Sequence, residues 1–313
     1  MTLKYPTGYQ DRRPIDVLAS FKQEQALLTG LATPGTVTQL PIAFRPMYFY
    51  DSSRPARVLI AAKIRTEKMA FKKKGAQIGV DLNIMGAAYA ENGSIAARFS
   101  ETLPISLEKE KEREFRKQDL AYRNYFRLRP GKYRLKLAVS DESNNLGSME
   151  QFLEVPALPG QGLAFSSLVV ADHLSRLPDL IQKLRTQLLD HADPLLYSGT
   201  QIQPSVENRM PVDSDIFVLF RIYNLPGRAE ECDLVANPEL LSEKGEQFFL
   251  PPINLKEAMS PVSSAEAVVG LRLSFRNAPP GKYRLMIKKT ETGSAQTANL
   301  QTDIEVVPKA TVE

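Results

Sequence analysis

The residues best suited to chemistry are two histidines that each have carboxylates as neighbours. His173 follows Asp172, and His191 lies between Asp190 and Asp193. An imidazole beside a carboxylate can bind a metal ion or transfer a proton. Neither histidine has a second histidine or a cysteine nearby, and their spacing does not place them on one helical face. We therefore expect surface histidines beside a helix end, and no metal site.

The single cysteine, Cys232, lies among acidic residues, with Glu230 and Glu231 before it and Asp233 after it. Nearby negative charge opposes formation of the thiolate, so this residue is a poor nucleophile. The sequence also lacks a nucleophile elbow, a Walker loop, a dinucleotide fingerprint and a zinc-protease helix. We therefore expect no catalytic residues and no cofactor, and the sequence favours a protein that is not an enzyme.

One basic run, residues 68–74, carries lysines around Phe71. Such a run either contacts phosphate or an anionic polymer, or forms a charged edge that prevents strand pairing. The mixed run 108–117 indicates a solvated turn or a short helix. The whole chain has a net charge of +4 with both signs interspersed. A dedicated duplex binder gathers more charge than this on one face, so we expect no nucleic-acid partner.

The strongest internal signal is a repeated hexapeptide. Residues 130–135 read Pro-Gly-Lys-Tyr-Arg-Leu, and residues 280–285 repeat these six residues. Both copies follow a run of alternating apolar residues, precede a polar turn, and lead to a strand that stops at a proline. Self-similarity at a fixed spacing indicates duplicated structural units.

The residues of each copy predict its local structure. In the first copy, apolar residues alternate with Lys132, Arg134 and Lys136, which indicates a strand with one buried face and one wet face. Pro-Gly predicts a tight turn before that strand. A tyrosine at the start of the strand is typical of the tyrosine corner of immunoglobulin-like sandwiches, where its hydroxyl bonds to nearby backbone; a merely buried ring is the alternative. The structural residues of the repeat are therefore Pro130, Gly131, Tyr133, Pro280, Gly281 and Tyr283.

Further strands are expected at residues 41–50, 56–64, 77–89 and 94–99 of the first unit, and at 163–171 and 215–223 of the second. The strand at 215–223 is apolar on both faces, so we expect it to be central and covered on both sides. Helices are expected at 14–28 and at 175–190. In the second helix Ser175 is the cap, and Leu177, Ile181, Leu184 and Leu188 form one apolar stripe.

These elements predict an all-β fold, with two tandem immunoglobulin-like or fibronectin-like β-sandwiches and one or two accessory helices. We assign residues 1–34 to an N-terminal strand and helix segment, and 35–156 to the first sandwich. A linker at 157–160 leads to the second sandwich at 161–308, which contains the inserted helix 175–190, and 309–313 form a tail. The linker is rich in proline and glycine but too short for free tumbling.

Several segments resemble the C-terminal region of the VWFA-related proteins of Acidobacteria. They are Gly8-Tyr9 followed by a helix, residues 94–100, Pro130 to Tyr133, residues 146–150 and residues 166–169. Members of that family look like exported proteins with a von Willebrand A-type domain followed by a β-rich tail, and residues 3–9 look like the last strand of such a domain. The adhesion motif Asp-x-Ser-x-Ser is missing, because Asp51-Ser52-Ser53-Arg54-Pro55 lacks its second serine. The family's metal-dependent adhesion therefore transfers to no residue of this chain.

The resemblance implies a non-catalytic interaction or spacer module of a secreted or envelope protein, of adhesion or protein–protein interaction type. The alternative is a carbohydrate-binding or accessory module, for which exposed aromatics at Tyr48 and Tyr50, or at Tyr122 and Tyr125, would be the sign. Expected partners are a protein or an upstream A-type domain, with polysaccharide as the alternative. The sequence has no stretch of about 20 apolar residues for membrane insertion. The first residues carry no signal-peptide core, so a cytoplasmic location is the alternative to export.

Overall fold

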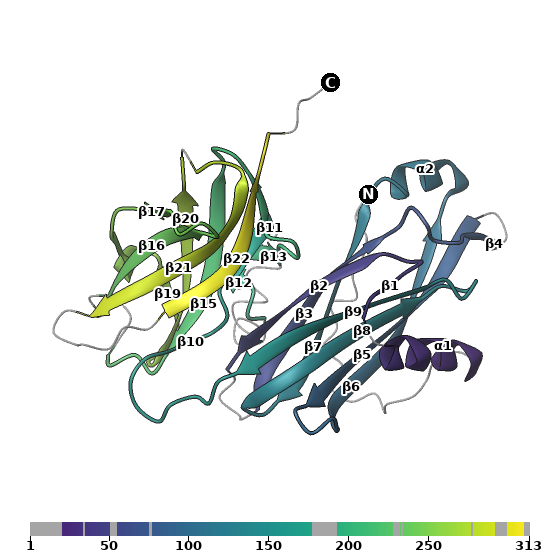
Figure 1. Cartoon of the computed structure of the whole chain (residues 1–313), viewed down its shortest axis with the longest axis horizontal. Coiled ribbons are helices and arrows are strands. Elements are labelled where there is room, and N and C mark those ends of the chain that lie inside the picture. Colours follow the sequence, from purple (N-terminus) through teal and green to yellow (C-terminus); the bar gives the residue numbers. More distant parts are fainter. Residues whose placement is uncertain are drawn as a thin grey trace. The chain divides into compact units, whose positions relative to one another are not determined.

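The computed structural model describes residues 21–33, 35–50, 55–74, 77–176, 193–227, 232, 234–276, 278–291 and 299–309. These residues are mostly β-strand, arranged in mainly antiparallel sheets, with the single longer helix α1 (Phe21–Ala32) and the four-residue α2 (Glu112–Phe115) (Figure 1). The predicted all-β class of immunoglobulin-like or fibronectin-like sandwich modules is confirmed.

The strands of the first predicted sandwich form two sheets. One has the order β2-β3-β7, and the other has the order β1-β9-β8-β5-β4 with β6 paired to β5. The chain switches between these sheets in the Greek-key manner of fibronectin-like sandwiches. The bounds are β1 Val37–Thr38, β2 Ile42–Phe49, β3 Ala56–Arg65, β4 Lys72–Lys74, β5 Gln77–Ala90, β6 Ile95–Leu107, β7 Asp119–Leu128, β8 Gly131–Ser140 and β9 Leu146–Val155.

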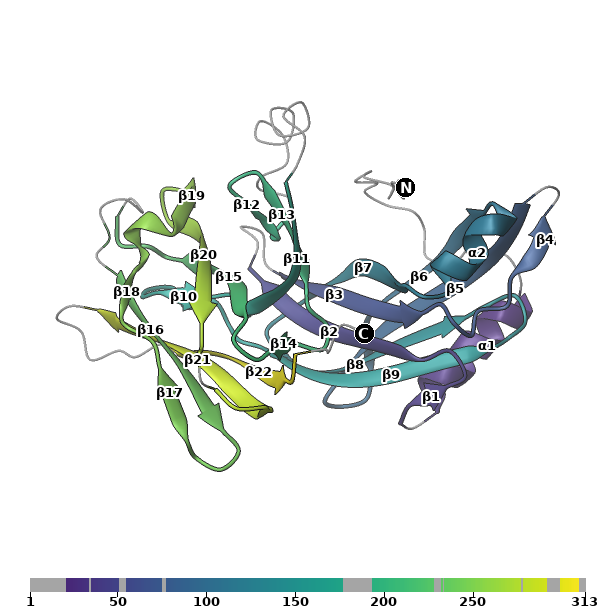
Figure 2. The ribbon, with the colours of Figure 1, turned by 90° about the horizontal axis from the view of Figure 1, so that it is seen from above.

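The second predicted sandwich repeats this arrangement. One sheet has the order β12-β13-β11-β15-β20-β19 with β10 paired to β15, and the other has the order β14-β22-β21-β16-β17 with β18 paired to β16. Figure 2 shows β16, β21 and β22 side by side. The bounds are β10 Ala164–Phe165, β11 Val169–Arg176, β12 Leu196–Tyr197, β13 Thr200–Pro204, β14 Arg209–Pro211, β15 Asp215–Tyr223, β16 Leu234–Ser242, β17 Gln247–Phe249, β18 Ile253–Asn254, β19 Met259–Ser263, β20 Glu266–Ser274, β21 Gly281–Glu291 and β22 Asn299–Val307.

The two copies of the hexapeptide hold the same place in their sheets. β8 starts at Gly131 and lies between β5 and β9, while β21 starts at Gly281 and lies between β16 and β22. The hydroxyl of Tyr133 donates a hydrogen bond to the backbone oxygen of Arg129 at 2.8 Å. That of Tyr283 donates to the backbone oxygen of Pro279 at 2.7 Å. Both rings are buried, so each tyrosine makes the bond expected of a tyrosine corner.

The expected wet face of β8 is partly covered, which corrects the sequence interpretation. Helix α1 buries Leu27 and Leu31 against this face, where Ala138 lies. Lys136 is only 5% exposed, yet its ammonium donates to the backbone oxygens of Leu31 and Thr33 at 2.9 and 3.1 Å. Its nitrogen also lies 3.2 Å from a carboxylate oxygen of Glu150. The buried charge is tolerated because the free carbonyls at the helix end and one carboxylate surround it.

Three segment predictions differ from the structure. Helix α1 spans 21–32 where we expected 14–28, because burial of Leu31 carries the helix onward; residues 14–20 lie outside the described residues. The strand expected at 163–171 is split into β10 and β11, because the chain between them turns to β2, where the Ser167 amide donates to the Tyr48 oxygen at 3.0 Å. Ser175, the expected cap, lies in β11 and pairs with Gln201 in the ladder of β11 and β13.

The remaining part of the helix expected at 175–190, with Leu177, Ile181, Leu184 and Leu188, lies outside the described residues. No helix among those described is long and apolar enough to cross a membrane. The mixed run at 108–117 forms a 3-10 turn at Lys109–Lys111 followed by α2, as predicted.

β15 is central and covered on both faces, as its sequence predicted. Ile216, Val218, Phe220 and Ile222 point into one apolar core, which they share with β16, β21 and β22. Leu219, with Phe217 beside it, belongs to a second core on the opposite face. We call this second core the junction core; its buried members are Met47, Phe49, Leu59, Ala61, Val169, Leu195, Ile202, Val206, Leu219 and Val268.

The junction core joins β2 and β3 to the sheet that contains β15. Contacts accordingly group residues 43–63 and 121–133 with the chain after Glu150 in one compact unit, which we call the junction unit. The other unit joins 64–120 and 134–150 to α1 and β1. The domain boundaries proposed from the sequence, with a linker at 157–160, stay a prediction.

Polar contacts also link β2 and β3 to the sheet that contains β11 and β15. The Tyr50 amide donates to the Tyr223 hydroxyl at 3.1 Å, and the two rings meet edge to face with centroids 5.1 Å apart. Lys63 pairs with Asp172 at 3.0 Å. Burial raises the pKa of Tyr50 to about 12 and also raises the pKa of Tyr223, since a charged phenolate is poorly solvated there.

We predict that the two corner hydroxyls contribute similarly to stability. Tyr133→Phe and Tyr283→Phe should each lower the free energy of unfolding by about 1 kcal/mol, because each leaves a backbone oxygen without its partner. Tyr125→Phe is the matched control, since Tyr125 is 39% exposed and keeps its ring under Arg57. Urea unfolding measures all three. Equal effects of control and corner variants would show that the corner bonds add nothing.

We also predict a loss of stability in alkali. An unfolded tyrosine has a pKa of about 10. Because the folded pKa of Tyr50 is raised, the stabilisation is complete below pH 10 and is lost as the pH rises towards 12. Melting temperature should fall less steeply between pH 10 and 12 in Tyr50→Phe than in the unaltered chain. An unchanged slope in that variant, with Tyr125→Phe as control, would rule out Tyr50 as a source.

Candidate binding site

The junction unit contains a pocket of about 490 Å³ between strands that are far apart in the sequence. β2 contributes one wall, the end of β9 a second, the segment between β10 and β11 a third, and β21 with β22 the fourth. The lining residues are Arg45, Pro46, Met47, Tyr48, Phe152, Leu153, Glu154, Ser166, Ser167, Leu168, Arg284, Leu300, Gln301, Thr302 and Asp303.

Arg45 is the most strongly positioned charge in the pocket. Its side chain leaves β2, and its Nε donates to the backbone oxygen of Val206 at 3.1 Å. Burial lowers the pKa of Arg45, and the nearby carboxylate of Asp303 opposes that shift. The guanidinium remains charged at neutral pH because an arginine starts from a pKa above 12. With Nε fixed on Val206, the terminal nitrogens make no hydrogen bond to any described residue.

The wall formed by β21 and β22 carries a carboxylate and a second arginine. Arg284, on β21, donates through Nε to Asp303 on β22 at 3.3 Å, and both side chains are well exposed. Asn208 donates to the backbone oxygen of Asp303 at 2.9 Å and to the hydroxyl of Thr302 at 3.0 Å. Asn208 is almost fully buried, so this end of β22 is held firmly.

The aromatic side chains of the pocket differ in exposure. Phe152, on β9, is 75% exposed. Tyr48 is largely covered, its ring meets Tyr50 edge to face at 5.6 Å, and its amide donates to the Ser167 hydroxyl at 2.9 Å. Burial raises the pKa of the Tyr48 phenol, and the Tyr50 and Glu154 side chains raise it further, so Tyr48 stays neutral.

These groups suit recognition. The two serines of the pocket are engaged with backbone, because Ser166 Oγ donates to the Ser167 oxygen and accepts from the Arg221 amide, both at 2.9 Å. Ser167 Oγ accepts from the Tyr48 amide, so both hydroxyls bond to backbone groups. What the pocket offers is a fixed guanidinium, an ion pair, several backbone groups and one exposed ring.

The residues singled out for chemistry are dispersed. His173 lies on β11 with an exposed side chain, and its neighbour Asp172 is engaged with Lys63. Cys232 is 6% exposed and belongs to the core shared by β15 and β16. His191 lies outside the described residues. Within the described ranges, no three His, Cys, Asp or Glu side chains gather as metal ligands would.

The basic run at 68–74 forms a charged sheet edge, one of the two alternatives. β4 is the last strand of its sheet and pairs only with β5 among the described strands. Met69 is buried, and Phe71 meets Phe115 edge to face with centroids 5.7 Å apart. Lys72 pairs with Glu142 at 3.4 Å.

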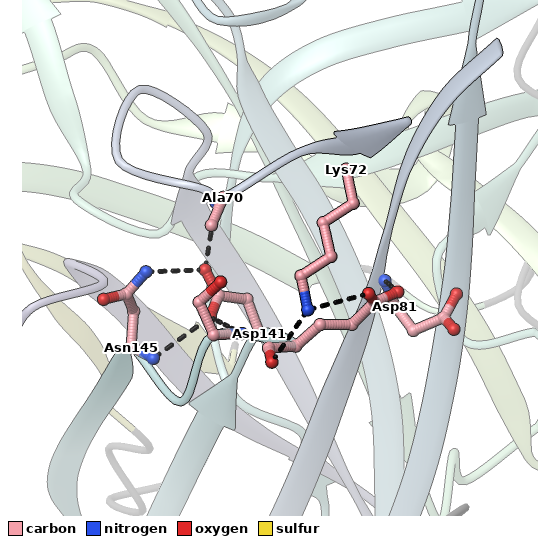
Figure 3. A network of polar contacts seen from close by, with 7 residues as sticks. Ala70, Lys72, Asp81, Asp141 and Asn145 are labelled. Carbon is pink, nitrogen blue, oxygen red and sulfur yellow. Dashed lines mark hydrogen bonds and ion pairs between the residues drawn. The ribbon is translucent and has the colours of Figure 1, made fainter. Parts of the chain in front are cut away.

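A polar network anchors this edge (Figure 3). The buried carboxylate of Asp141 accepts from the amides of Ala70, Ser143 and Asn145 at 2.9–3.0 Å, and from the Asn145 side chain at 2.8 Å. Glu142 accepts from the Asp81 amide at 3.1 Å. The polar turn expected after β8 thus holds the basic run in place.

The four candidate aromatics have different fates. Tyr48 lines the pocket and Tyr50 packs behind it. Tyr122 is buried and accepts from the Asn124 side chain at 2.8 Å. Tyr125 is exposed, and the guanidinium carbon of Arg57 lies over its ring, 5.5 Å from the ring centre. Sequence reasoning missed Arg45, Phe152 and Asp303, which come from three separate segments and share no local motif.

No protein-family model matches the sequence, and no curated protein matches it. Among solved structures, the chain is similar to the fibronectin(III)-like modules of CbhA from Clostridium thermocellum, with 10% identity over 82% of this chain and 88% of that one, at a TM-score of 0.20. A Salmonella alpha-2-macroglobulin matches with 9% identity over 87% of this chain and 24% of that one, at a TM-score of 0.31.

A family 123 glycoside hydrolase from Clostridium perfringens matches with 11% identity over 47% of this chain, at a TM-score of 0.25. The match covers 27% of the hydrolase, so this chain corresponds to about a quarter of the length of the hydrolase and of the macroglobulin.

Proposed function

We propose that the chain is a non-catalytic spacer and interaction module of a secreted or cell-envelope protein, as its resemblance to VWFA-related proteins suggests. The observation that carries this proposal is the junction core. It joins β2 and β3 to a sheet whose other face already packs on β16, β21 and β22. A sheet covered on both faces is a buried layer, and it leaves no hinge between the strands on either side of it.

The energetics favour a fixed junction. Burial of each large apolar side chain of the junction core, such as Met47, Leu59 or Leu219, contributes roughly 1.5–3 kcal/mol. The hydrogen bonds from Arg45 to Val206 and from Tyr50 to Tyr223 are directional, so they add to the packing by favouring one orientation of the strands. A spacer needs such a junction, because it must hold its neighbours at a constant separation.

The interaction role rests on the pocket. Arg45, Arg284 and Asp303 present charge beside the exposed ring of Phe152. Aromatic and arginine side chains are the residue types that dominate protein interfaces. A protein is therefore the partner we propose, an A-type domain included, and nucleic acid is not.

A carbohydrate-binding module is the second candidate. Phe152 exposes its ring beside Asp303, Gln301 and Glu154, which could bond to sugar hydroxyls. Tyr48, the other aromatic of the pocket, is only partly exposed and meets Tyr50 edge to face, so it offers less ring surface for stacking than Phe152. This contrast favours the protein partner.

The spacer role predicts a single distance across the junction. Spin labels at Arg123→Cys on β7 and Lys282→Cys on β21 sit on exposed positions of the junction unit, in a Cys232→Ala background. Pulsed electron spin resonance should give one narrow distance distribution. Labels at Arg272→Cys and Lys282→Cys, both within the second predicted sandwich, supply the reference width. A distribution across the junction several times wider than this reference would refute the spacer.

A further inference from the structure

The outer edges of β9 and β22 border the pocket. Along the residues that line the pocket, no described strand pairs with these edges. β1 pairs with β9 only at Gly147 and Ser148, whereas the pocket is lined by β9 residues 152–154. β14 pairs with β22 only at residues 305–307, whereas the pocket is lined by residues 300–303. The opposite edges of these strands are occupied by β8 and β21. An open strand edge with unpaired backbone groups is a template for another strand.

The hydrogen bonds of β22 show which backbone groups face this edge. The Val307 oxygen accepts from the Val212 amide at 2.8 Å, and the Glu305 amide donates to the Asn208 oxygen at 2.9 Å. The Asp303 oxygen accepts from the Asn208 side chain at 2.9 Å. Because every second residue of a strand directs its backbone groups to the same side, Gln301 is the next residue on this edge. Its N–H and C=O face the pocket.

The charges and the ring of the pocket indicate which side chains a bound strand carries. A strand pairing at Gln301 places side chains alternately to the two faces of the sheet. Arg45 has its terminal nitrogens uncommitted within the described structure, and a guanidinium binds carboxylate with paired hydrogen bonds. Phe152, which lines the same pocket, is 75% exposed and favours an apolar neighbour.

We infer that this pocket binds an extended peptide of another protein, which pairs with β22 at Gln301, places a carboxylate side chain on Arg45 and an apolar side chain on Phe152. The peptide continues the edge that β14 occupies at residues 305–307. Recognition through added strand pairing draws affinity from the main chain and specificity from alternate side chains. This inference rests on the proposed interaction function and names its partner.

The test is a selection of random heptapeptides on the purified chain, followed by Kd measurement for a synthetic peptide of the enriched sequence. We expect enrichment of sequences with one Asp or Glu next to β-branched or aromatic residues. Arg45→Met should weaken binding at least tenfold. The control Arg209→Met should leave Kd unchanged, because it removes an equal charge from β14. Two peptides are compared, each N-methylated at every second amide. Methylation of the set of amides that faces β22 should abolish binding, and methylation of the other set should not.

A second variant tests the strand pairing directly. Gln301→Pro removes the outward N–H without touching the ladder to β21, and proline is tolerated on such an edge. It should abolish peptide binding, whereas Gln301→Val, which keeps the N–H, should not. If Gln301→Pro fails to fold, the N-methylated peptides carry the same test.

Three outcomes would overturn the inference. In the first, no peptide is enriched. In the second, Arg45→Met and Arg209→Met bind the selected peptide equally well. In the third, the pocket binds an oligogalacturonate and no peptide. None of these results changes the distance distribution across the junction, so the spacer part of the proposed function stands or falls separately.

Discussion

The structure of the junction unit depends on a sheet that is buried on both faces. β15 places Val218 and Phe220 in the core shared with β21, and places Leu219 in the junction core with β2 and β3. A strand with two apolar faces is unstable unless both are covered, so the strands β2 and β3 complete the second sandwich as well as belonging to their own sheet. The proposed fixed junction follows from this one layer.

β2 takes part in both the pocket and the junction core. Its residues Met47 and Phe49 pack into the junction core, and Arg45, Met47 and Tyr48 line the pocket. The short crossing at residues 166–168, which bonds to β2 through Ser167, closes one side. The groups proposed to bind are therefore carried mainly by strands, whose backbone ladders position the side chains.

Much of the fold could be predicted from the sequence. The repeated hexapeptide located the corner tyrosines and their strands, because a turn, a strand and a buried ring are all local signals. The two apolar faces of β15 identified the central strand. β16 was missed because Asn237, Pro238 and Glu239 interrupt its alternation of apolar and polar residues. The buried carboxylate of Glu239 is paired with Lys288 on β21 at 2.6 Å. Lys136 was misassigned to solvent because nothing in β8 signals the helix that covers it.

The candidate site was far less accessible to sequence reasoning. Histidines and cysteine attracted attention by type, yet the His173 side chain is exposed on β11 and Cys232 lies in a core. Arg45, Phe152 and Asp303 are common residue types, separated by more than a hundred positions, and only pairing between distant strands gathers them. A binding pocket built from strand edges has no motif, because its backbone groups are the same in every residue.

Native-state hydrogen exchange in increasing urea tests the shared junction core most directly. The amides of Leu59 and Ala61 on β3, and of Val218 and Leu219 on β15, should open with one free energy. Leu219→Ala, which removes a fully buried side chain, should lower that energy by about 2–5 kcal/mol at both strands. If the variant lowers protection on β15 and leaves β3 unchanged, the strands do not share a core and the account is wrong.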